Sequence, residues 1–194
     1  MSAAPTHASG AMATFVAALR AEGGTIAELT TDQRLASGPS EPARLAASGP
    51  RAQGLEAEYE LLVEMIFEGC RLHYGPQRVV RTADHDLALL LGDQLYAMGL
   101  ARLARIGDLE AIGELADVIS LVAQAHVARE RELADAVWNA GAVAIGWGTD
   151  VRHAEAKELV RTGDPGAAAA RRIVAAERRV KNGQDRRTAS PTRP

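Results

Sequence analysis

The sequence predicts an all-α protein, a helical bundle whose core is built mainly from aliphatic side chains. Hydrophobic residues make up 47% of the 194 residues but aromatic residues only 4%, so Ala, Leu, Val and Ile must fill most of the core. From residue 55 onward the apolar residues recur at three- and four-residue steps, which is the spacing of one helix face. A chain of this length suits one domain with a sizeable core.

Charge and cysteine content narrow the class of protein further. The formal net charge is -3, which argues against a globally basic nucleic-acid binder. Cys70 is the one cysteine, so an intramolecular disulfide framework is excluded and a reducing compartment is favoured. The sequence shows neither a secretory signal pattern nor roughly 18 uninterrupted apolar residues, which would be typical of a membrane span. We therefore expect a cytoplasmic protein.

Residues 1–54 are expected to form a mobile or loosely packed N-terminal region. Residues 1–10 show no periodicity, and short helices are predicted over 11–22 and 25–35. Residues 37–54 carry three prolines together with several Gly and Ser residues, which interrupt any long element. We therefore predict a linker or a loosely packed approach to the core there, leading into a bundle domain over residues 55–180.

The first strong helix is predicted over residues 55–73. Gly75 and Pro76 end it, and either Thr82 or Asp84 can cap the next helix. That second helix reaches Ile106, and its leucine-rich run is interrupted by Gly92 and Asp93. Because glycine costs about 1 kcal/mol in a helix interior relative to alanine, the interruption indicates close helix packing.

A longer helix is predicted to begin after Gly107 and Asp108 and to continue to Asn139. Its apolar residues keep helical spacing over more than six turns. Gly141, Gly146 and Gly148 then permit a bend or a close helix contact.

The C-terminal part is predicted to hold two further helices, over 151–160 and 167–180. Gly163, Asp164 and Pro165 mark the turn between them, with Pro165 as the first residue of the second helix. Residues 181–194 are expected to be a disordered basic tail. A solvated tail is the favoured interpretation of these basic residues, and contact with an anionic membrane surface or with nucleic acid is the alternative.

The segment around Gly92 resembles the all-trans polyprenyl diphosphate synthase family. The matching residues are a leucine run followed by a Gly-Asp step, a large residue and a small one, and a later Gly-Asp turn: Leu89, Leu90, Leu91, Gly92, Asp93, Leu95, Tyr96, Ala97, Gly107 and Asp108. The likeness covers residues 55–148 and is greatest to the small, noncatalytic subunit of heterodimeric heptaprenyl-type synthases. It implies a bundle similar to part of the isoprenoid synthase fold.

The chemistry of that family is not expected of this chain alone. Active members hold Mg²⁺ with Asp-Asp-x-x-Asp motifs, whose carboxylates bind the cations that neutralise a diphosphate. This sequence contains no Asp-Asp pair. We therefore predict no catalytic or metal-ligating residue and no cofactor here, with Mg²⁺ held by a catalytic partner subunit.

Seven residues are candidates for structural or interface roles: Gly92, Asp93, Leu95, Tyr96, Met98, His126 and Trp138. For Asp93 we weigh an interhelical hydrogen-bond network against an exposed carboxylate. Leu95, Tyr96 and Met98 are bulky enough to limit the space for an elongating prenyl chain. We expect His126 to be a hydrogen-bonded core or interface residue rather than a metal ligand. For Trp138, core packing is favoured over a role as an interface anchor.

A metal site of the HD phosphohydrolase type is an alternative interpretation of His85 and Asp86. It needs further ligands, which His73, His126, His153, Asp93 or Asp117 would have to supply. A capping aspartate at a helix start explains the same residues without a metal.

The leading functional hypothesis is an accessory subunit that pairs with a separate catalytic polyprenyl diphosphate synthase. By analogy it would support activity and product chain length in isoprenoid biosynthesis. The competing hypothesis is a self-associating helical scaffold or adaptor with no link to isoprenoids, because helical periodicity specifies a buried face and not a partner.

Overall fold

The computed structural model describes residues 6–32 and 38–188, with side chains given for 10–32 and 38–177. Within these ranges the chain is helical and contains no strand beyond an isolated β-bridge between Thr30 and Val80. The predicted all-α class is therefore confirmed. The expected mobile residues 1–5 and the end of the tail, 189–194, lie outside the described residues.

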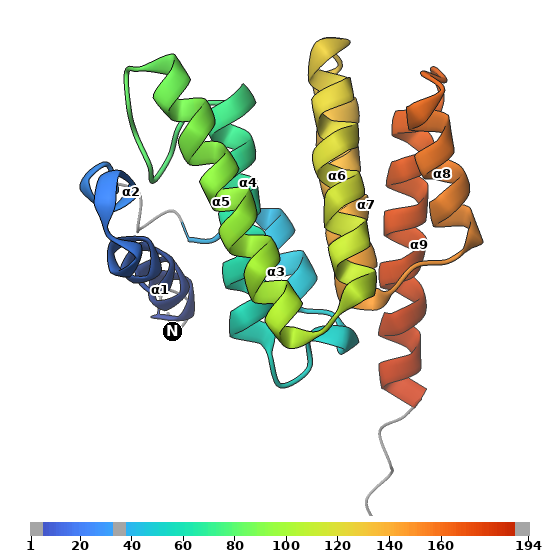
Figure 1. The fold of residues 1–194 in the computed structure, drawn as a ribbon. Helices are drawn as coiled ribbons and strands as arrows, with labels where there is room; N and C mark the ends of the chain where they lie inside the picture. Colours follow the sequence, from blue (N-terminus) through green and yellow to red (C-terminus); the bar gives the residue numbers. More distant parts are fainter. Residues whose placement is uncertain (1–5, 33–37, 189–194) are drawn as a thin grey trace, which may run out of the picture.

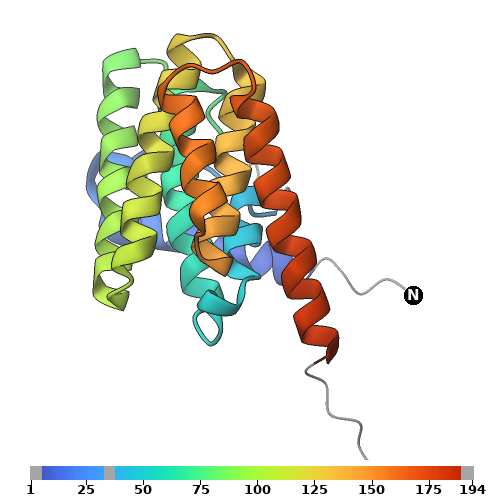
Figure 2. The same cartoon turned by 90° about the vertical axis from the view of Figure 1, so that its right-hand side faces the viewer.

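Three antiparallel helix pairs stand side by side (Figure 1). They are α4 (Glu56–Tyr74) with α5 (His85–Ile106), α6 (Leu109–Val127) with α7 (Arg131–Trp147), and α8 (Val151–Arg161) with α9 (Ala167–Thr188). In Figure 1 the helices α5, α6 and α8 lie in front of α4, α7 and α9, and the turned view of Figure 2 shows the layers edge-on. The bundle is thus layered, with α5 and α6 on an outer side.

The boundaries of α4 and α5 agree with the predicted helices. Asp84 caps α5 by accepting a hydrogen bond from the Leu87 N–H at 3.1 Å. Gly107 ends α5 in the left-handed conformation, at φ 83°, and the Asp108 side chain caps α6. These ends follow from residues that are visible in the sequence.

The single helix predicted over 109–139 is wrong, because the chain turns between α6 and α7. The Glu130 N–H bonds to the Ala125 carbonyl and the Arg129 N–H to the His126 carbonyl, which is a Schellman motif. Arg129 holds the left-handed position of this motif, at φ 60°, where glycine is usual. No glycine or proline in the sequence marks this turn.

The linker predicted over 37–54 is also wrong, because the described part of this segment, residues 38–54, packs inside the bundle. It forms α3 (Glu41–Ala47) and a 3₁₀ turn, η2 (Pro50–Ala52). The Ser40 side chain caps α3, and Ala43 and Ala46 have no exposed surface. Pro42 is compatible with the helix because it lies in the first turn, where its missing N–H would have no partner.

The N-terminal segment is packed as well. Helix α1 (Thr6–Glu22) begins earlier than the predicted residue 11, and the helix predicted over 25–35 is the short α2 (Gly24–Glu28). Met12, Phe15 and Leu19 of α1 pack with Leu61, Leu95 and other residues of α4 and α5 in a second core. An amphipathic stripe is thus buried where we expected loose packing.

The C-terminal pair differs from expectation only at its ends. Helix α8 matches the predicted 151–160, and Gly163 turns the chain at φ 70°. Helix α9 begins at Ala167 rather than Pro165 and continues to Thr188, so residues 181–188 are helical where a disordered tail was expected.

The close packing expected at Gly92 is confirmed, and it extends to two other glycines. A β-carbon on Gly92 would lie 2.6 Å from the His73 ring of α4, and one on Gly99 would lie 2.9 Å from the Leu62 carbonyl oxygen. Gly69 faces Gly92 from the other helix. Small residues therefore let α4 and α5 approach each other closely.

Helix α5 is the one helix among residues 6–32 and 38–188 whose length and composition would let it cross a membrane. Core helices of soluble proteins can have the same length and composition, but they are mostly buried. Here only 33% of the most apolar stretch is buried within the bundle. Helix α5 therefore leaves apolar surface exposed.

Replacing Gly146 by alanine should destabilise the fold. Its β-carbon would lie 2.6 Å from the Ala46 carbonyl oxygen, so α3 and α7 would have to move apart. We expect the free energy of unfolding to fall by about 1–3 kcal/mol. The matched control is Gly113→Ala, because nothing lies within 4 Å of that β-carbon on α6. Gly113→Ala should raise the free energy of unfolding by about 0.5–1 kcal/mol. Urea denaturation of both variants measures the difference. Equal effects of the two substitutions would contradict the packing argument.

Candidate functional site

A row of rings crosses the end of the bundle where α4 ends. His73 of α4 stacks on Tyr96 of α5 with ring centroids 5.2 Å apart, and Tyr74 stacks on His126 of α6 at 4.6 Å. The adjacent His73 and Tyr74 rings are 5.6 Å apart and complete the row. The structure thus brings the candidates Tyr96 and His126 into one row. They are connected by His73, which the sequence suggested only as a metal ligand, and by Tyr74, which was not a candidate.

A groove of about 500 Å³ opens beside this row, where the end of α4 faces the turn between α6 and α7. The candidate Trp138 is buried in its wall and meets Phe67 edge-on, with ring centroids 5.0 Å apart. Burial raises the pKa of the neighbouring Cys70 thiol, which therefore stays protonated and unreactive at neutral pH. Burial lowers the pKa of His126, so its ring stays neutral there.

Asp93 lies at the α5 end of the ring row. Its side chain is 69% exposed, and its Oδ1 is 3.1 Å from the His73 Nε2, close enough for an ion pair but not aligned as a hydrogen bond. The carboxylate is therefore exposed and makes one contact between α5 and α4. Leu95 and Met98 point elsewhere, into the core shared with α1, where Leu95 is fully buried and Met98 partly buried.

His85 and Asp86 are exposed at the start of α5, beside the capping Asp84. The other proposed ligands of an HD-type metal site are dispersed: His126 stacks on Tyr74, and His153 is buried against Glu114. Among residues with described side chains, no group of three His, Cys, Asp or Glu residues could hold a metal ion. Apart from the contact between His73 and Asp93, the structure does not bring the ligands proposed for this metal site together.

A first cluster of buried charges joins α1, α4 and the loop before α5. Glu68 is fully buried, and its Oε1 accepts hydrogen bonds from the N–H groups of Arg78, Val79 and Val80. Arg78 also forms ion pairs with Glu64 and Glu68. Burial raises the pKa of Glu68 despite these bonds. The cluster fixes the loop, because without it three backbone donors would lack partners.

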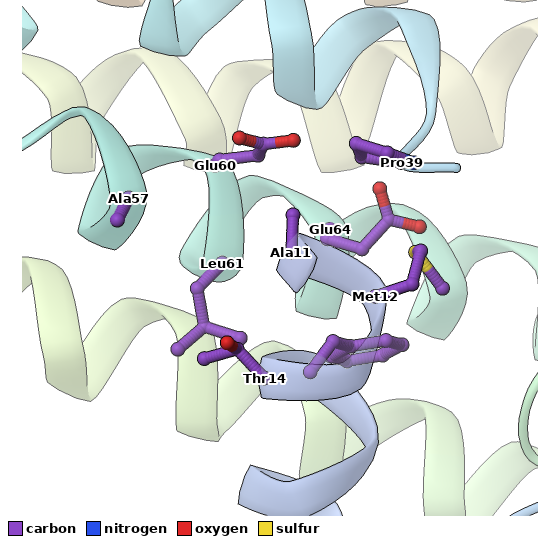
Figure 3. A pocket seen from close by; sticks show the side chains of 9 residues that line it. Ala11, Met12, Thr14, Pro39, Ala57, Glu60, Leu61 and Glu64 are labelled. Atoms are coloured by element: carbon purple, nitrogen blue, oxygen red, sulfur yellow. The ribbon is translucent and has the colours of Figure 1, made fainter. Parts of the chain in front are cut away.

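A small pocket lies beside this cluster, between α1 and α4 (Figure 3). The carboxylates of Glu60 and Glu64 lie on the side of Pro39, with Met12 of α1 nearby. Burial raises the pKa of Glu60. The volume of about 50 Å³ has room for water but not for an organic ligand.

A second cluster of buried charges joins α6 to α8. Glu114 of α6 is buried, and its two oxygens lie 2.7 Å from the His153 Nε2 and 2.7 Å from the Lys157 Nζ. Lys157 also bonds to Asp117 at 2.6 Å. Burial alone would raise the pKa of Asp117, but its hydrogen bonds and the charges of Lys157 and Arg161 hold that pKa below the usual range.

Arg171 brings α9 into the same cluster. It has no exposed surface, and its guanidinium lies 3.4 Å from both ring nitrogens of His153 and donates to the Val137 carbonyl of α7 at 3.3 Å. Burial lowers the pKa of Arg171 to about 10, so it remains charged at neutral pH. Sequence reasoning missed this cluster, although Glu114 occupies a position on the apolar stripe between Ala111 and Val118.

The outer side of α5 and α6 is apolar and exposed, and we call it the α5–α6 face. Exposed small or aliphatic residues and one serine gather on it: Leu90, Ala97, Ala101 and Ala104 on α5, and Leu109, Gly113, Ala116, Ser120 and Val127 on α6. On α5 the exposed carboxylates of Asp86 and Asp93 interrupt this apolar surface, four residues before and three residues after Leu90. Leu109 is 77% exposed and Val127 is 86% exposed. Along α6 these positions follow three-, four- and seven-residue steps, so they form one uncharged stripe.

The fold and these features define a helical bundle with buried charge clusters, a ring-lined groove and one exposed apolar face. No protein-family model matches the chain, and no curated protein or solved structure is significantly similar to it.

Replacing Glu114 by alanine should loosen the α8–α9 pair. The substitution leaves His153, Lys157 and Arg171 without their shared carboxylate, and breaking a buried ion pair from one side costs about 3–5 kcal/mol. Chemical denaturation measures this loss. The control is Glu132→Ala, which removes an exposed ion pair to Arg172 and should change stability by less than about 1 kcal/mol. Equal, small effects of both substitutions would contradict the assigned role of the cluster.

Proposed function

We propose that the protein is a noncatalytic helical subunit that acts by pairing with another helical protein, a catalytic polyprenyl diphosphate synthase. The observation that carries the proposal is the α5–α6 face. Soluble proteins rarely expose large contiguous apolar surface, and such surface is characteristic of protein interfaces. Small residues also let a partner helix approach closely.

The resemblance of the Gly92–Asp93 segment to the synthase family supports the choice of partner. The resembling residues lie on α5, one of the two helices that make the α5–α6 face. The sequence also lacks the paired aspartates with which active members bind Mg²⁺ and diphosphate. A chain of this kind would contribute to prenyl transfer through its partner, in the cytoplasm.

Partner binding should be lost when charge is placed on this face. We expect Ala101→Glu combined with Ala116→Glu to abolish co-elution with a polyprenyl synthase homologue that has intact Asp-rich motifs. The reason is that two carboxylates would be desolvated in the interface without partners. The measurement is size-exclusion chromatography of the co-expressed proteins, followed by an isopentenyl diphosphate condensation assay.

The control for this experiment is Ala169→Glu, an exposed alanine on α9 that lies away from the face. It should leave both co-elution and activity unchanged. Condensation of isoprenoid diphosphates by the isolated wild-type chain would contradict a noncatalytic role. A stable homo-oligomer that ignores the synthase, and that the paired substitutions dissociate, would favour the self-associating scaffold instead.

A further inference from the structure

The groove between the end of α4 and the α6–α7 turn has a positive lining on a protein of net charge -3. Arg71, Arg129 and Arg131 line it, with Asp135 as the acidic residue in the lining. His126 does not add charge at neutral pH, because burial lowers its pKa. The groove therefore favours an anion that carries more than one charge.

The three arginines differ in how many side-chain interactions they already make within the protein. Arg71 donates from Nε to the Pro76 carbonyl at 2.9 Å, and its guanidinium lies 5.8 Å from the centre of the Phe67 ring. Arg129 and Arg131 form no side-chain ion pair with a residue that the structure describes. Two guanidinium groups thus remain available to bind oxygen atoms of a ligand.

Arg129 is also the one non-glycine residue with positive φ among residues 6–32 and 38–188. Glycine would adopt this left-handed position without steric strain. The fold nevertheless holds an arginine there, at the rim of the groove. The Schellman motif at the end of α6 therefore fixes the backbone from which this side chain projects.

The apolar part of the lining is aromatic. One face of the Tyr74 ring is stacked on His126, the residue as a whole is 42% exposed, and Phe67 and Trp138 lie deeper. Exposed aromatic rings beside guanidinium groups suit a planar ligand that stacks on the ring while its anionic end is held by forked hydrogen bonds. The volume of about 500 Å³ has room for a ligand of nucleotide size.

We propose that this groove binds a phosphate monoester with a planar aromatic body, of which a nucleoside monophosphate is the natural form. Phosphate monoesters carry nearly two negative charges at neutral pH, which matches three arginines opposed by one aspartate better than a carboxylate does. The ring row supplies the stacking surface and the α6–α7 turn supplies the phosphate contacts.

The test is isothermal titration calorimetry of the full chain with AMP, with adenosine and inorganic phosphate as its two halves. We expect AMP to bind with a submillimolar Kd and each half at least tenfold more weakly. Arg131→Ala and Arg129→Gly should each weaken AMP binding at least fivefold. Arg172→Ala, which removes an exposed arginine of α9, is the control and should leave the affinity unchanged.

Arg129→Gly separates binding from folding. Glycine suits the left-handed position, so the variant should unfold at the same or a higher temperature than the wild type while it loses AMP affinity. The proposal is overturned if AMP binds no more tightly than phosphate, if Arg129→Gly binds AMP like the wild type, or if Arg172→Ala weakens binding equally. The Ala101→Glu and Ala116→Glu substitutions should leave AMP binding intact, so this result is independent of partner binding.

Discussion

The contact between α3 and α7 is the constraint on which the arrangement of the bundle depends. Gly49, just after α3, lies against Gly146 so closely that a β-carbon on Gly49 would be 2.0 Å from the Gly146 carbonyl oxygen. Helix α3 contacts both α4 and α7 and so joins the α4–α5 pair to the α6–α7 pair. Because α3 spans only seven residues, it does not separate the two pairs along their whole length. The groove opens beyond it, at the end where α4 and the α6–α7 turn face each other.

Two clusters of buried charge then hold the loop before α5 and helix α9 against this centre. Arg78 with Glu64 and Glu68 fixes the segments near α1, and Arg171 with Glu114 fixes α9. Buried ion pairs are not reliable sources of net stability, since desolvation offsets much of their attraction. Their effect is to select one arrangement, because any other docking of these segments would leave charges buried without partners.

The sequence predicted correctly the helices whose ends are marked by capping residues and glycines. The prediction was wrong for helices whose ends or existence depend on tertiary packing or on an unusual backbone conformation. Asp84 and Gly107 mark the ends of α5 in the sequence. Arg129 ends α6 in a left-handed conformation that an arginine does not predict. Likewise α3 is short and proline-containing, and it is stabilised by its Ser40 cap and by burial against α4 and α7. Among the candidates, Gly92 could be placed from propensity alone. The grouping of Tyr96 with His126 could not, because it depends on how three helices converge.

Helix α5 has small residues on opposite sides, and this feature links the fold to the proposed pairing. On its inner side Gly92 and Gly99 let α4 approach closely, as the short distances to His73 and Leu62 show. On its outer side Ala97 and Ala101 are exposed, so that side presents a similarly flat surface without a helix against it. Small residues on both sides of a helix let two neighbours approach it closely at those positions. The chain itself supplies one of these neighbours in α4, and a partner chain would supply the other.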